Sequence, residues 1–206
     1  MNYSEIITTE EIEPLETASF SGPIIIVSEP GQIFNEAVKH LNDQRFIGFD
    51  TETKPVFQAN CTRSKTALLQ LSSETKSYLF RLHELGLPQE IADILANKYI
   101  TKIGAAVHDD IRGLQKYRYF TPGRFIDLQQ IAENYGIKEK SVRKLAAIIL
   151  KTKVSKSQQL SNWEAEELSD AQQKYAATDA WVCLVMYKKL LASPKKERQP
   201  EQNYNI

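Results

Sequence analysis

The sequence lacks the features of a membrane, secreted or zinc-thiolate protein. Its 206 residues include only two cysteines, Cys61 and Cys183, which are far apart and do not have the spacing of a zinc site. Every apolar run is far shorter than the roughly 20 residues that a transmembrane helix needs. The chain does not open with a basic segment followed by an apolar one, as a signal peptide would. These absences predict a cytoplasmic protein with reduced thiols and no membrane partner.

A net charge of either sign is also missing, because lysine plus arginine and aspartate plus glutamate each number 26. The protein as a whole therefore cannot attract a nucleic acid; a local basic patch or bound metal ions would have to do so. Hydrophobic residues make up 42% of the chain and charged residues 25%, an ordinary balance for a globular protein. The length suits one domain with a sizeable core.

The hydrophobic pattern predicts one α/β domain at residues 23–193, with a mixed sheet flanked by helices. Residues 1–22 are expected to form an extended arm packed loosely on this domain, and residues 194–206 a polar tail. Strands are predicted at 23–28, 46–50, 66–71, 77–82 and 99–104, with the third and fourth in an antiparallel meander. Helices are predicted at 32–41, 88–97, 109–117, 127–135, 141–150 and 170–192. Asp127 is expected to cap the helix that follows it.

Four acidic residues in three separated motifs lie on an apolar background, where an unpaired carboxylate is costly. They are Asp50 and Glu52 in FDTET, Asp110 in GAAVHDDIRGL and Asp179 in YAATDA. Asp50 and Glu52 are two residues apart near a strand end, so they share one face. Tyr175 and Asp179 are spaced i, i+4 and share a helix face. Carboxylates gathered from distant segments are the ligands that a hard divalent cation requires.

Each motif taken alone has a simpler interpretation. Asp50 and Glu52 fit solvated acids at a strand end, and Asp110 fits an acid favoured by a helix N-terminus. Tyr175 and Asp179 fit a core tyrosine and a surface acid on a rotated helix. The occurrence of all three motifs in one chain favours a metal site over these separate explanations.

In this order, the motifs resemble those of the DEDDy subgroup of DnaQ-like 3′–5′ exonucleases, which have a ribonuclease-H-like fold. The similarity is greatest to the Werner-syndrome helicase exonuclease domain and looser to ribonuclease D, and it covers roughly residues 23–192. The segment LSNWEAEELSDAQQKYAATDA is especially similar to the Werner-type sequence. Asp109 and Asp110 are adjacent, and matching IGAAVHDD to the Werner-type pattern favours Asp110 as the second-motif aspartate.

The resemblance implies two-metal-ion hydrolysis of phosphodiester bonds at nucleic-acid 3′ ends, which releases nucleoside 5′-monophosphates. Asp50 is expected to bridge both ions, Glu52 and Asp179 to complete the first site, and Asp110 to hold the second. Tyr175 is expected to orient the attacking water, because a phenol with a pKa of about 10 is a poor base at neutral pH. The all-oxygen ligand set suits two Mg²⁺ or Mn²⁺ ions.

Contacts with the substrate are expected from Thr51 and Thr53, which flank Glu52, and from Lys156, which belongs to a basic cluster suited to phosphates. That cluster is Arg143, Lys144, Lys151, Lys153 and Lys156. The loop at residues 54–65, which contains Phe57, is a weaker candidate for a wedge against the terminal base.

Three functions remain open at this stage. The Werner-type similarity favours DNA 3′ ends, whereas the ribonuclease D similarity favours trimming of RNA 3′ ends. The non-enzymatic alternative is a catalytically inactive nucleic-acid-binding domain, and the complete set of acidic residues argues against it. The sequence does not predict an oligomeric state.

Overall fold

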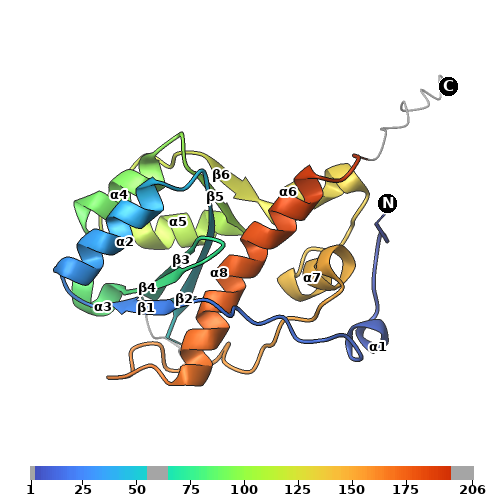
Figure 1. The fold of residues 1–206 in the computed structure, drawn as a ribbon, viewed down its shortest axis with the longest axis horizontal. Helices are drawn as coiled ribbons and strands as arrows, with labels where there is room; N and C mark the ends of the chain where they lie inside the picture. Colours follow the sequence, from blue (N-terminus) through green and yellow to red (C-terminus); the bar gives the residue numbers. More distant parts are fainter. Residues whose placement is uncertain (1–2, 55–64, 196–206) are drawn as a thin grey trace, which may run out of the picture.

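In the computed structural model, which describes residues 3–54 and 65–195, one mixed sheet has helices on both faces (Figure 1). The strand order is β1-β4-β3-β2-β5-β6. The strands are β1 Ile24–Val27, β2 Phe46–Thr53, β3 Thr66–Ser72, β4 Ser77–Arg81, β5 Thr101–Gly104 and β6 Phe125–Asp127. The helices are α1 Thr9–Ile12, α2 Gln32–Asn42, α3 Leu82–Leu85, α4 Gln89–Ala96, α5 Val107–Gln115, α6 Leu128–Ile131, the 3₁₀ helix η1 Ala132–Tyr135, α7 Val142–Leu150 and α8 Asp170–Leu191.

Strands β2, β3 and β4 form the predicted antiparallel meander, whereas β1, β5 and β6 join the sheet in parallel. All seven residues of β3 are buried because both faces of the sheet are covered, and its mostly apolar sequence is interrupted by Gln70. β2 continues three residues beyond the predicted end at Asp50 and reaches Thr53. The first acidic motif therefore lies inside a strand, and its side chains alternate between the two faces.

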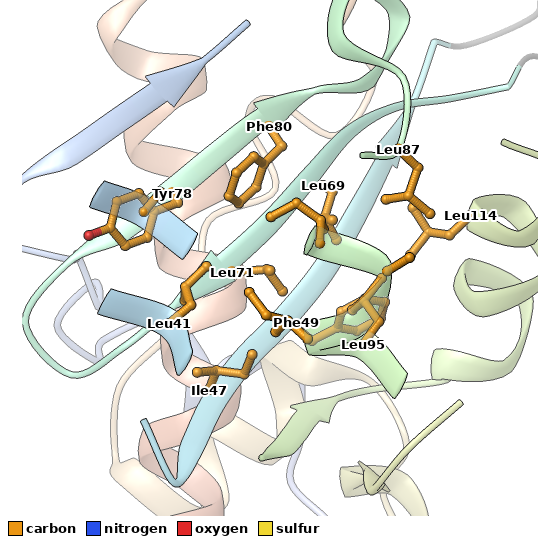
Figure 2. Close-up of a cluster of buried hydrophobic side chains, with 14 of the residues drawn as sticks. Leu41, Ile47, Phe49, Leu69, Leu71, Tyr78, Phe80, Leu87, Leu95 and Leu114 are labelled. Atoms are coloured by element: carbon orange, nitrogen blue, oxygen red, sulfur yellow. The ribbon is translucent and has the colours of Figure 1, made fainter. Parts of the chain in front are cut away.

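One face of the sheet packs on α2 and α4 (Figure 2). Ile47 and Phe49 of β2 and Leu69 and Leu71 of β3 lie in this core together with Leu41 and Leu95. The opposite face of β2 packs on α8. A Cβ atom on Gly48 would overlap the backbone carbonyl of Ala180 in that helix. Because strand side chains alternate, Asp50 and Glu52 share the α8 side with Gly48.

Helix α8 crosses the sheet as one long helix (Figure 1). Its N-terminus has a capping box, in which Ser169 and Gln172 each bond the backbone of the other. The stripe that continues the Tyr175 and Asp179 face is buried; it comprises Val182, Cys183, Met186 and Leu190. None of the helices within residues 3–54 and 65–195 has the length and apolarity needed to span a bilayer.

The N-terminal segment is not the loosely packed arm that the sequence predicted. Thr8 and Glu11 form a capping box on α1, and the side chains of Ile12 and Phe20 are only 2% and 1% exposed. Thr17 forms a parallel bridge with Lys153. A few separated anchor residues hold this segment on the domain, and sparse anchors produce no periodic hydrophobic pattern.

The predicted helix at 127–135 is confirmed from Leu128 onward, but the strand that ends at Asp127 was not predicted. Phe125–Asp127 form β6, which pairs with β5, and the helical part divides into α6 and a 3₁₀ turn. Asp127 nevertheless accepts the backbone N–H of Gln129, so the predicted cap is confirmed. A three-residue strand has too short a pattern to be recognised without its partner. Cys61, the loop around Phe57 and residues 196–206 of the tail lie outside the described residues.

Candidate active site

Three of the predicted acids meet between β2 and α8. Carboxylate oxygens of Asp50, Glu52 and Asp179 all lie within 4.8 Å of one another. Asp50 and Glu52 point toward α8 because they are alternate residues of β2, and α8 approaches closely at Gly48. The three side chains help to line a cavity of about 320 Å³. Residues far apart in the sequence thus form one compact set of oxygen ligands.

Asp110 reaches the same region from α5. The Thr51 hydroxyl donates a hydrogen bond of 2.5 Å to Asp110 Oδ1. Asp109, by contrast, has a side chain that is 74% exposed and is ion-paired with Arg112 at 2.6 Å. The charge of Asp110 contributes to the raised pKa of both Asp50 and Glu52. The structure therefore places Asp110, and not Asp109, beside the other acids.

Burial and mutual repulsion make this acidic set unfavourable without a cation. Burial raises the pKa of Asp50 well above its usual range, and the charges of Asp179, Glu52 and Asp110 add to the effect. Burial also raises the pKa of Glu52 to about 8 and that of Asp179 to about 7. A divalent cation would favour the ionised carboxylates, and the oxygen-only set suits a hard ion. The residues present therefore fit a divalent metal site.

Tyr175 lies beside Asp179 on α8, and its hydroxyl forms a hydrogen bond with the Asp179 carboxylate. Burial, followed by the charges of Asp179 and Glu52, raises the pKa of Tyr175 further above its ordinary value. The tyrosine ring packs near Trp163, with 6.0 Å between ring centroids, and Trp163 is fully buried. Without a bound cation the phenol therefore stays protonated at neutral pH and can donate a hydrogen bond.

Of the residues predicted to contact substrate, some line the acidic cavity and one does not. Lys156 lines the same cavity as the acids, and so does Thr51. The Thr51 hydroxyl, however, is bonded to Asp110, so it positions an acid in this structure. Thr53 is exposed at an irregularity in the β2–β3 pairing and does not line the cavity.

Only part of the predicted basic cluster reaches the cavity. Arg143 of α7 lines it together with Lys156. Lys144 instead pairs with Glu139, and the ammonium group of Lys153 donates to a backbone carbonyl in the N-terminal segment. Arg143 was predicted as a member of the basic cluster, whereas Ser155 and Gln159, which also line the cavity, were not predicted. The two missed residues lie in an irregular loop that has no periodic signal.

A model of the 3′–5′ exonuclease family matches residues 25–193. The chain belongs to the 3′–5′ exonuclease family. This membership and the shared fold confirm the predicted ribonuclease-H-like exonuclease domain. The acidic cluster fits the divalent-metal site expected of such a domain.

Relatives of the exonuclease domain come from proteins of different architectures. The chain is 33% identical over 159 residues to the mouse bifunctional 3′–5′ exonuclease/ATP-dependent helicase WRN. The match covers 73% of this chain and 11% of the relative. It is 33% identical over 162 residues to the Drosophila melanogaster exonuclease 3′–5′ domain-containing protein 2, covering 77% and 27%. The chain therefore spans between about a tenth and about a quarter of these relatives.

The fold is shared with Escherichia coli RNase D, an exoribonuclease involved in structured RNA processing. The TM-score is 0.71 at 21% identity, and the match covers 81% of this chain and 44% of the RNase D chain. At this identity, the likeness establishes the fold. Both similarities that the motifs indicated, Werner-type and ribonuclease D-type, are confirmed.

The acidic cluster predicts that the stability of the metal-free domain decreases with pH. The folded-state pKa values of Glu52 and Asp179, about 8 and about 7, lie above the values near 4 of unfolded carboxyls. The unfolded chain therefore binds fewer protons between these limits, and the free energy of unfolding falls as pH rises through them. Mn²⁺ should reverse this loss, so the metal-induced increase in Tm is expected to be larger at pH 8.5 than at pH 5.5.

Calorimetric melting in EDTA and in Mn²⁺ at the two pH values measures this difference. At a metal concentration 100 times the Kd, binding to the folded state adds about 2.7 kcal/mol. An Mn²⁺-induced shift of equal size at both pH values would contradict the assignment of Glu52 and Asp179 to the cation site.

Proposed function

We propose that this protein is a metal-dependent 3′–5′ exonuclease that hydrolyses phosphodiester bonds at DNA 3′ ends and releases nucleoside 5′-monophosphates. The convergence of Asp50, Glu52 and Asp179 on one cavity, in a chain of the exonuclease family, carries this proposal. Mg²⁺ or Mn²⁺, when bound, would activate the attacking water and stabilise the leaving oxygen.

The proposed ligand roles follow from the geometry of the acids. Asp50 is the acid whose pKa responds to all three of the others, which supports a central, ion-bridging position. Glu52 and Asp179 complete one site with it, because their oxygens lie within 4.8 Å of one another. Asp110, held by the Thr51 hydroxyl, contributes from the other side of β2.

Tyr175 is proposed to orient the attacking water and the scissile phosphate. Its protonated hydroxyl is held by Asp179, and its ring packs near Trp163, so the donor has a defined position. A fixed donor aimed at a reacting oxygen lowers the barrier without accepting a proton.

Arg143 and Lys156 are proposed to contact the phosphates of the substrate. Both line the acidic cavity, where they supply positive charge beside the carboxylates. Phosphate contacts of this kind position a nucleic acid without reading its sequence. Because Thr53 lies outside the cavity, a contact from it would require substrate that extends past the cavity rim.

The choice of DNA rests on the relatives with the higher identity. These include the WRN exonuclease/helicase at 33% and the DNA polymerase I of Aquifex aeolicus at 30%, of which the match covers 25%. The likeness to RNase D, at 21% identity, supports the fold alone. The alternative substrate, an RNA 3′ end, is therefore tested in the same experiment.

A gel time course with 5′-labelled DNA and RNA oligonucleotides of the same sequence tests the proposal. With Mg²⁺ or Mn²⁺, the labelled product is expected to shorten stepwise from the 3′ end, faster for DNA, and EDTA should stop the reaction. Single-stranded and recessed ends are compared in parallel. Faster shortening of RNA would replace DNA by RNA as the substrate. No shortening of either oligonucleotide with either metal would leave an inactive nucleic-acid-binding domain.

A further inference from the structure

Gln70 of β3 is a buried amide whose two polar ends have no partner. Its side chain is 0% exposed, and neither Oε1 nor Nε2 forms a hydrogen bond with any residue that the structure describes. Buried polar groups are nearly always bonded, because an unmade hydrogen bond costs free energy that water would otherwise recover. The unpaired amide therefore indicates a hydrogen-bond partner that is within reach only in another state of the site.

The position of Gln70 identifies that partner. Gln70 lies directly opposite Asp50 in the antiparallel pairing of β2 and β3. Opposed residues of such a pair share one face, with Cβ atoms about 4.5–5.5 Å apart. The face is the one covered by α8, because Gly48 meets Ala180 of that helix on it. The Gln70 side chain therefore starts next to that of Asp50, in the layer between the sheet and α8.

Two other polar side chains of this layer are paired, whereas the buried indole Nε1 of Trp163, which packs there with Leu68 and Ala176, also has no partner among the described residues. Ser72, two residues along β3 on the same face, is hydrogen-bonded to Ser77 at 2.7 Å and donates to the Ala177 carbonyl at 3.4 Å. Gln172 of α8 uses its amide in the capping box. If residue 70 only filled space, methionine or leucine would fill it equally well, without the free-energy cost of an unpaired amide.

We propose that Gln70 is a positioning residue for Asp50, whose carboxylate accepts a hydrogen bond from the Gln70 amide when divalent cations bind. The proposal rests on the metal-dependent function argued above. When a carboxylate ligates a metal, a hydrogen bond from a neighbouring side chain to that carboxylate sets its orientation and favours its ionised form. The terminal torsion of glutamine is broad, so the amide can turn toward Asp50 without displacement of β3.

Replacement of Gln70 by methionine tests this role without reference to activity. Mn²⁺ binding, measured by titration calorimetry, is expected to weaken by about 10–100-fold, the usual effect of losing such a partner. The Tm of the metal-free variant is expected to equal or exceed that of wild type, since the unpaired amide is gone. The matched control is Ser72→Ala, on the same strand and face, which should leave the Mn²⁺ affinity unchanged.

A second measurement on the wild type covers the case in which Gln70→Met does not fold. The side-chain amide signals of Gln70 in a ¹⁵N spectrum are expected to shift on titration with Mg²⁺, and to stay in place when Asp50 is replaced by asparagine. Unchanged Mn²⁺ affinity in a folded Gln70→Met protein, or unmoved amide signals in a wild type that binds Mg²⁺, would overturn the role of Gln70 alone. A wild type that binds neither ion and shortens no oligonucleotide would overturn the proposed function together with it.

Discussion

Replacement of Asp50 by asparagine is expected to lower the rate of 3′-end hydrolysis by about 10³-fold or more. Metal assistance contributes several kcal/mol to catalysis, and each 1.4 kcal/mol corresponds to about a factor of ten in rate. Asparagine keeps the shape of the side chain and removes the charge that would bridge the cations. Asp50 is also the acid most affected by its neighbours, since Asp179, Glu52 and Asp110 all raise its pKa. The metal-free variant should therefore be at least as stable as the wild type, because one repelling buried charge is gone.

Initial rates on a 5′-labelled oligonucleotide in Mn²⁺ measure this effect, and thermal melting in EDTA verifies the fold. Asp109→Asn is the matched control, because Asp109 is exposed and paired with Arg112, and such a surface pair contributes little. Asp110→Asn, one residue along, should by contrast lose most of the activity. Wild-type rates from Asp50→Asn would contradict the bridging role, and a loss of activity in Asp109→Asn alone would reverse the assignment of the second motif.

Replacement of Gly48 by alanine is expected to lower the free energy of unfolding by about 3 kcal/mol or more, an effect at the upper end of those for overpacked sites. The added methyl group would overlap the carbonyl oxygen of Ala180 and lie 2.6 Å from its carbonyl carbon. Both are backbone atoms of α8, so no side chain can move aside to relieve the contact. The helix itself has to shift, and it carries Tyr175 and Asp179. Activity should therefore fall together with stability.

Urea denaturation followed by circular dichroism measures the loss. Gly31→Ala is the matched control, because a Cβ atom there meets nothing within 4 Å. Gly31 is the N-cap of α2, where alanine in place of glycine costs at most about 1 kcal/mol. Equal stability of the two variants would show that α8 does not approach β2 as closely as the structure has it.

The elements that sequence analysis predicted correctly have strong local patterns. The mostly apolar segments of β3 and β4 and the capping box of α8 specify these elements from neighbouring residues alone. The same local rules placed Asp50 and Glu52 on one face, and Tyr175 and Asp179 on another. The candidate site was predictable to this extent because each motif orients its own side chains.

Other features depend on contacts between distant segments. β6 exists because Phe125–Asp127 pair with β5, and the N-terminal segment is ordered because Phe20 and its neighbours pack on the domain. Neither contact leaves a periodic pattern in its own segment. In the same way, Arg143 and Lys156 reach the cavity whereas Lys144 and Lys153 do not, although all four belong to one basic cluster in the sequence.

The sequence by itself determined which chemistry is available, because the acids, the tyrosine and their spacing within each motif are local properties. The tertiary structure decided how closely these groups meet and what each of them contacts. It directs Asp110, and not Asp109, toward the acids through the Thr51 hydroxyl, and it buries the unpaired Gln70 amide opposite Asp50. The physical reason is that strand register and helix packing set these distances, and both arise from contacts between residues far apart in the chain.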